Sequence, residues 1–170
     1  MKKSSVFQQY EIWRTIAKRS LWSESIATSS GPMNQSQDTF LFLVREVPSD
    51  VLTQQKELIP WFDYVAKVAQ GISDHGLESI VQFGEEDQSF FLVTKLIHGE
   101  SLQVLQEITP SFFTIPQAVY LVSTLAKHLH QIDYLQREVY QIAEPIVHGT
   151  ISPQSIWITY QGEVMLSELG

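Results

Sequence analysis

Three groups of side chains in this sequence could do chemistry. A histidine in a loop, such as His148, can act as a general base, but its apolar neighbours predict a structural role instead. His128 and His130 could bind a metal ion, yet side chains two positions apart on a helix diverge. The acidic run at 85–87 could attract a cation, although such a run is typical of a solvated turn. None of these groups defines a site by itself.

The composition is that of a globular, acidic protein. Hydrophobic residues make up 44% of the 170 positions and charged residues 18%. The formal net charge of −8 disfavours binding to nucleic acid or to an anionic membrane. Because the chain has no cysteine, disulfides and thiolate metal sites are excluded. No apolar run is long enough for a membrane span, and no cleavable signal is recognisable, so we expect a cytoplasmic protein, or one exported without such a signal.

The N-terminal half of the sequence predicts mainly strands. Apolar, branched and aromatic residues indicate strands at 10–28, 40–47, 79–83 and 89–96. Apolar residues at spacings of three and four predict one amphipathic helix at 59–72. The polar segments at 29–38 and 84–88 are expected to be a loop and a hairpin turn.

The C-terminal half predicts helices followed by a small hairpin. The expected helices cover 101–107 and 115–132, and the longer one carries a wide apolar stripe that predicts a buried face. Residues 98–100 break the pattern before them. The expected hairpin strands are 156–160 and 163–166.

A longer pattern lies in the C-terminal segment, where residues 147–158 read VHGTISPQSIWI and residues 167–170 read SELG. This pattern resembles the catalytic loop H-R-D-L-x-x-x-N, the hairpin after it and the D-F-G motif of protein kinases, with a bacterial serine/threonine-kinase character. Residues 42–45 (FLVR) lie where that family has V-A-I-K. Thr94 then corresponds to the gatekeeper residue, and Lys95 to Ile97 correspond to the hinge.

The resemblance implies that the nucleotide-binding positions are altered. The glycines that let the backbone approach the phosphates are replaced by Ala17, Arg19 and Trp22 or Ser23. The strand lysine corresponds to Arg45, which keeps the charge but has a different shape. The helix glutamate that pairs with that lysine corresponds to Val65, so this ion pair is expected to be lost.

The positions for the chemical step are also altered. The aspartate that receives the hydroxyl proton corresponds to Thr150, which cannot act as a base near neutral pH. The magnesium-binding asparagine corresponds to Ser155, a weaker ligand, and the D-F-G aspartate corresponds to Glu168. In this family the histidine at position 148 serves the structure of the loop. Of these residues, only Glu168 is expected to be able to hold a metal ion.

The fold class implied by the resemblance is α+β. We expect a basic arm at 1–9, a kinase-like small lobe and hinge at 10–97 with antiparallel strands and one helix, and a partial large lobe at 98–170. Because the sequence ends at the D-F-G-like motif, the helix from Ile115 is expected to keep an exposed apolar face. Among the tryptophans, Trp61 and Trp157 are expected in the core, and Trp22 is the better candidate for a partner anchor.

The expected function is that of a catalytically inactive pseudokinase that binds a protein as a scaffold or regulatory module. No cofactor is expected, and a vestigial nucleotide pocket would involve Ala17, Arg45, Thr94, Lys95 and Ile97. The alternative is a divergent serine/threonine kinase that binds ATP with magnesium through Arg45 and Glu168, completed by residues absent from this chain. A third interpretation is a degenerate remnant without an independent function.

Overall fold

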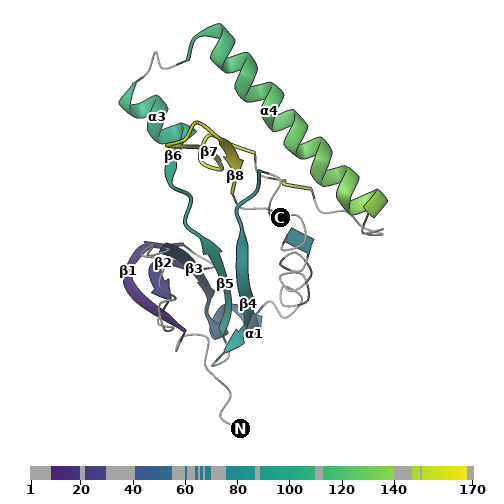
Figure 1. Cartoon of the computed structure of the whole chain (residues 1–170). Helices are drawn as coiled ribbons and strands as arrows, with labels where there is room; N and C mark the ends of the chain where they lie inside the picture. Colours follow the sequence, from purple (N-terminus) through teal and green to yellow (C-terminus); the bar gives the residue numbers. More distant parts are fainter. Residues whose placement is uncertain are drawn as a thin grey trace, which may run out of the picture. The chain divides into compact units, whose positions relative to one another are not determined.

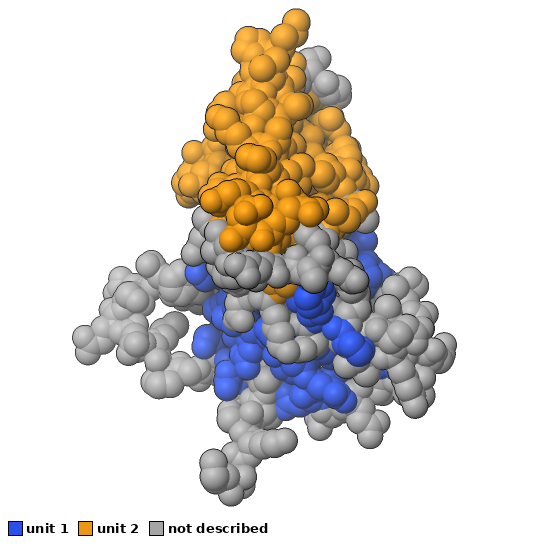
Figure 2. Space-filling model, turned by 90° about the vertical axis from the view of Figure 1, so that its right-hand side faces the viewer, with its two compact units in different colours: residues 1–66, 80–96 blue, residues 67–79, 97–170 orange. Residues whose placement is uncertain are grey.

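The computed structural model describes residues 9–19, 22–29, 41–54, 76–86, 89–109, 113–139, 147–149 and 151–167, together with residues 60, 64, 66, 68 and 69. The chain divides into two compact units, which Figure 2 shows in different colours. The first unit contains residues 1–66 and 80–96, and the second contains residues 67–79 and 97–170. None of the helices in the described part of the chain is long and apolar enough to cross a membrane.

The first unit is built on a five-stranded antiparallel sheet with the order β1-β2-β3-β5-β4 (Figure 1). Its strands are β1 (Tyr10–Lys18), β2 (Ser23–Ser29), β3 (Leu41–Val47), β4 (Ile80–Glu86) and β5 (Ser89–Lys95). A short helix that the sequence analysis missed, α1 (Ser49–Gln54), follows β3. The strands expected in this half are confirmed, and the segment 10–28 forms two strands instead of one.

Both faces of β5 are covered, because successive side chains of a strand point to opposite sides of the sheet. Phe91 and Val93 pack with Phe42 and Val44 in one buried cluster. Phe90 packs with Val47 and with Leu52 of α1 in another. The aromatic and branched residues of β3 and β5 therefore form the centre of this unit.

The second unit combines a three-stranded sheet with two helices (Figure 1). Its elements are β6 (Gly99–Ser101), α3 (Leu102–Ile108), α4 (Ile115–Tyr134), the π-helical turn η2 (Leu135–Val139), β7 (Ile156–Thr159) and β8 (Val164–Leu166). The core contains Leu77, the buried face of α4 at Leu121, Leu125 and Ile132, and the fully buried Leu166 of β8.

Capping side chains fix where both helices of the second unit begin. The Ser101 hydroxyl accepts a hydrogen bond from the Val104 backbone N–H at the start of α3. Thr114 and Gln117 form a reciprocal capping box at the start of α4, and a proline occupies the first turn. The expected helices and C-terminal hairpin are confirmed.

The expectation that residues 98–100 are irregular was wrong for Gly99 and Glu100. These residues belong to β6 and pair with Thr159 and Ile158 of β7. A Cβ atom at position 99 would collide with the Ile158 carbonyl oxygen, so the close pairing needs glycine here. The glycine that looks like a strand breaker in the sequence permits the strand.

Three expectations fall largely outside the described residues. They are the basic arm at 1–9, the loop at 29–38, of which only Ser29 is described as part of β2, and the helix at 59–72. Within the last segment, residues 60, 64, 66, 68 and 69 are helical, and Ala66 and Ala69 are buried.

Candidate functional site

An ion pair between neighbouring strands marks the first candidate site. Arg45 on β3 and Glu24 on β2 lie directly opposite each other in the strand register. The Arg45 Nε atom lies 3.0 Å from the Glu24 Oε1 atom, and the two side chains are only 13% and 8% exposed. Arg45, which occupies the position of the phosphate-binding lysine in the kinase resemblance, is thus held by a carboxylate of its own chain.

Two residues of the turn between β1 and β2 join the same carboxylate. Trp22 donates its indole N–H to Glu24 Oε1 at 3.4 Å, and an Arg19 guanidinium nitrogen lies 3.7 Å from Glu24 Oε2. The guanidinium of Arg19 also lies over the Trp22 ring, 5.8 Å from its centroid. Glu24 therefore collects donors from Arg45, Trp22 and Arg19, and we call these four residues the Glu24 cluster.

The sequence analysis missed Glu24. It expected Arg45 to have lost its acidic partner, because the corresponding helix position is Val65, which lies outside the described residues. The structure supplies a carboxylate from a different element, the adjacent strand. Only the β2–β3 register could have revealed this pair, since 21 positions separate the two residues in the sequence.

The other residues of the proposed nucleotide pocket are placed as follows. Ala17 of β1 lies opposite Glu24 and is half-buried, so a small side chain adjoins the Glu24 cluster. Thr94 of β5 is buried, whereas the next residue, Lys95, is exposed. Ile97 is half-buried and belongs to the second unit.

Trp22 has intramolecular contacts on both its ring and its N–H. The ring packs against the Val47, Leu52 and Phe90 cluster, and the N–H is directed at Glu24. Trp157 is half-buried and donates its N–H to the Ser167 hydroxyl at 3.2 Å. By contrast, Trp13 on β1 is largely exposed, and Trp61 lies outside the described residues.

Ser155 is the centre of the second candidate site, the segment that resembles the kinase catalytic loop. Its side chain is fully buried. Its hydroxyl accepts a hydrogen bond from the Ser152 N–H at 3.0 Å and donates one to the Ser152 carbonyl at 3.1 Å. The Ser167 N–H bonds the Ser155 carbonyl at 2.9 Å. The Ser155 hydroxyl thus closes its own turn, which is held in turn by the end of β8.

The neighbouring candidate residues of this segment are only partly described. His148 is buried, and Gly149 adopts a left-handed backbone with φ of 74°. Thr150 and Glu168 lie outside the described residues. His128 and His130 are half-buried and exposed on α4, and among the described residues no group of three or more histidine, aspartate and glutamate side chains is placed to hold a metal ion.

Restoring the kinase amide at position 155 is expected to destabilise the protein. The change Ser155→Asn adds atoms at a fully buried position and removes both hydroxyl hydrogen bonds. We expect the free energy of unfolding to fall by about 1–3 kcal/mol, measured by guanidinium denaturation. The same change at the exposed Ser123 of α4 should alter it by less than about 0.5 kcal/mol. A Ser155→Asn protein as stable as the wild type would contradict the burial of this site.

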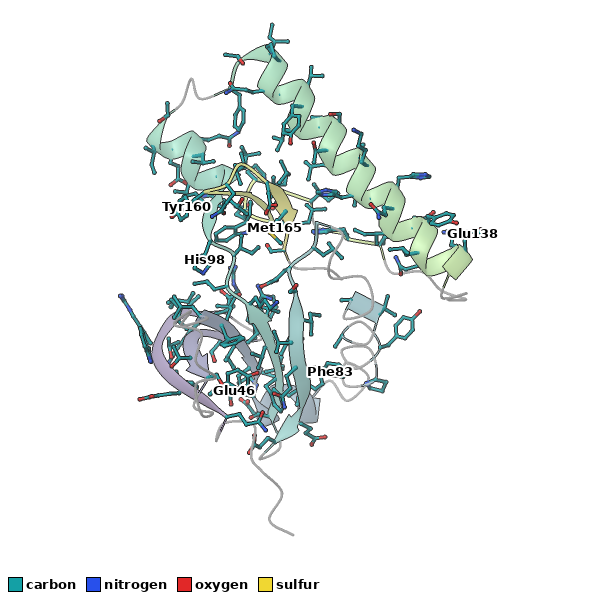
Figure 3. All side chains as sticks on the ribbon, in the orientation of Figure 1. Glu46, Phe83, His98, Glu138, Tyr160 and Met165 are labelled. Atoms are coloured by element: carbon teal, nitrogen blue, oxygen red, sulfur yellow. The ribbon has the colours of Figure 1, made fainter. Side chains whose placement is uncertain are left out.

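Tyr160, at the end of β7, has a perturbed pKa. Its hydroxyl donates to the Glu100 carboxylate at 3.0 Å, and its backbone N–H bonds the carbonyl of His98, which lies near it in Figure 3. This hydrogen bond, followed by the negative charge of Glu100, raises the pKa of Tyr160 above its ordinary value of 10.0.

The neutral variant Glu100→Gln should therefore lower the pKa of Tyr160 towards 10.0, because the amide keeps an acceptor but removes the charge. Spectrophotometric titration of the phenolate checks this expectation, with Tyr160→Phe identifying the signal among the six tyrosines. An unchanged pKa in Glu100→Gln would contradict the assignment.

The long helix α4 has an exposed apolar face in addition to its buried one. Ile115, Val119 and Val122 follow one another at spacings of four and three and are 82%, 62% and 64% exposed. We call these three residues the α4 stripe. The expectation of an exposed apolar face on this helix is confirmed for the described residues.

The fold is that of a protein kinase. The kinase domain of PknI from Mycobacterium tuberculosis superimposes with a TM-score of 0.70 at 14% identity, over 95% of this chain and 59% of that one. A second structure of that domain gives the same TM-score and identity over 99% and 63%, and its C20A_R136N double mutant gives 0.71 at 13% over 95% and 60%. No protein-family model and no curated protein matches the sequence.

The expected α+β, truncated kinase-like fold is confirmed by these structures. The chain spans about 59% of the length of the PknI kinase domain.

Proposed function

We propose that this chain is a catalytically inactive pseudokinase module that acts in the cytoplasm by binding another protein. The observation that carries the proposal is the Ser155 hydroxyl, which is fully buried and committed to the backbone of its own turn. A kinase needs a metal ligand at this position. A side chain that is buried and already hydrogen-bonded in both directions is poorly suited to that role.

The neighbouring substitution supports the same conclusion. Phosphoryl transfer in kinases uses an aspartate that receives the proton of the attacking hydroxyl, and Thr150 occupies that position. Losing a positioned general base slows such reactions by about 10²–10⁴-fold. With Ser155 also lost as a ligand, the residues present do not fit a magnesium–ATP complex, even though Glu168 retains a carboxylate.

The α4 stripe supports a protein partner. Exposed apolar residues that cluster on one face mark interaction surfaces more often than scattered ones do. The chain carries a net charge of −8, yet its helical segment from Ile115 to Ala126 contains no charged residue. An uncharged, apolar helix face of this kind suits the buried centre of a protein–protein contact.

The catalytic half of the proposal is tested on the purified wild-type chain. We expect neither ATP with magnesium nor ATP with EDTA to raise the unfolding temperature, and no transfer of labelled phosphate to a general substrate or to the chain itself. A ligand at 100 times its Kd would stabilise the protein by about 2.7 kcal/mol, which such a measurement detects. Magnesium-dependent stabilisation together with phosphate transfer would establish the divergent serine/threonine kinase instead.

The binding half is tested with matched charge variants of α4. Val119→Lys with Val122→Lys places two charges in the α4 stripe, whereas Ser123→Lys with His130→Lys places two lysines at exposed positions outside it. We expect the first variant to lose proteins that co-purify with the wild-type chain from its native cells, and the second to keep them. Equal recovery with both variants, with both folded, would exclude the stripe as the binding surface.

A further inference from the structure

We infer that the Glu24 cluster is an anion-binding site whose occupant is the chain's own Glu24 carboxylate, and that this carboxylate excludes phosphate groups from Arg45. The inference rests on the proposed function and deepens it, because it names the residue that keeps nucleotide phosphates out of the first unit. It concerns four residues of that unit alone.

The donors around Glu24 are those that proteins use for oxyanions. A guanidinium N–H from Arg45 lies at 3.0 Å, an indole N–H from Trp22 at 3.4 Å and a second guanidinium from Arg19 at 3.7 Å. Guanidinium groups match carboxylates and phosphates alike, since both present oxygens at similar spacing. The same donors could therefore hold a phosphate if Glu24 did not hold them first.

The geometry favours the internal carboxylate over a free anion. Glu24 lies directly opposite Arg45 in the β2–β3 register, so its carboxylate is always present at a high effective concentration. A phosphate that displaced it would leave a negative charge with 8% exposure beside the incoming anion. Separating a buried ion pair and adding a like charge are both strongly unfavourable.

The charge balance gives the consequence of removing that carboxylate. Arg19 and Arg45 contribute two positive charges and Glu24 one negative charge, so the cluster carries 2 − 1 = +1. The variant Glu24→Gln raises this to +2 and keeps an amide oxygen that can accept one hydrogen bond. An exposed, flexible anion then no longer competes with a charged neighbour of the same sign.

The experiment uses inorganic pyrophosphate without metal, titrated into the whole chain by calorimetry. We expect Glu24→Gln to bind at least about tenfold more tightly than the wild type, because an anionic competitor is replaced by a neutral group. The double variant Glu24→Gln with Arg45→Met should lose this gain. Glu46→Gln is the matched control, because Glu46 follows Arg45 on β3 and the change removes the same charge. Its affinity should equal that of the wild type.

A second variant covers the case in which Glu24→Gln folds poorly. Glu24→Ala removes the carboxylate altogether, and pyrophosphate should raise its unfolding temperature more than that of the wild type. The inference is overturned if both variants respond to pyrophosphate as the wild type does, or if Glu46→Gln gains as much as Glu24→Gln.

The result also separates this inference from the proposed function. Unchanged pyrophosphate affinity in a wild type that transfers no phosphate removes the role of Glu24 and leaves the pseudokinase intact. Phosphate transfer by the wild type removes the pseudokinase, whatever Glu24→Gln does.

Discussion

Replacing Phe91 with alanine is expected to lower the free energy of unfolding by about 3–5 kcal/mol. Phe91 is buried at the centre of β5 and packs with Phe42, Val44 and Val93. Its removal leaves a cavity that a sheet paired on both sides, by β3 and β4, cannot easily close. Guanidinium denaturation followed by far-ultraviolet circular dichroism measures the change.

The matched control for Phe91 is Ile16→Ala in β1 of the same sheet. Ile16 is exposed, so its truncation should change the free energy of unfolding by less than about 0.5 kcal/mol. A Phe91→Ala protein that unfolds at the same denaturant concentration as Ile16→Ala would mean that the packing of this unit is incorrectly assigned.

The second large effect is expected from Leu166→Ala, which should destabilise the second unit by about 2–5 kcal/mol. Leu166 is fully buried on β8 and packs in the core that also contains Leu77 and Leu125. Its backbone N–H bonds the Gly76 carbonyl at 2.7 Å, and its carbonyl accepts from the Glu78 N–H at 2.8 Å. Leu166 thus joins β8 to the segment at 76–78 through both side chain and backbone.

Hydrogen exchange locates the effect of Leu166→Ala within the chain. We expect faster exchange at the amides of β7 and β8, which share its core, relative to the wild type. Ile108→Ala, at an exposed position of α3, is the control and should leave these amides unchanged. Equal exchange in Leu166→Ala and the control would contradict the central position of Leu166.

The two candidate sites relate to the proposed function in different ways. At the second, Ser155 lacks a free hydroxyl to offer a metal ion because its turn uses that hydroxyl. At the first, Arg45 retains the charge that a nucleotide-binding position needs, but Glu24 neutralises it within the sheet. If both proposals hold, the altered positions have acquired structural partners of their own.

Parts of the candidate sites could be predicted from sequence because they lie inside local patterns. Arg45 ends an apolar strand motif, and Ser155 lies five positions after Thr150 in a loop with a recognisable spacing. The partner of Arg45 could not be found in this way, since a strand register depends on pairing between distant segments. The burial of Ser155 likewise depends on β8, which returns to cover its turn.

The sequence by itself determined the order of strands and helices and the kinase-like class of the fold. Hydrophobic periodicity and turn residues act over a few positions, which is why β3, β5, α3, α4 and the β7–β8 hairpin were predictable. It could not reveal β6, whose Gly99 reads as a breaker until the close approach to Ile158 is known.

Only the tertiary structure decided which charges meet and which segments share a core. It placed Glu24 opposite Arg45, and it grouped residues 67–79 with the C-terminal unit, where Leu77 packs beside Leu166. The physical reason is that ion pairing and core packing depend on distances in space between residues far apart in the chain, which no local pattern encodes.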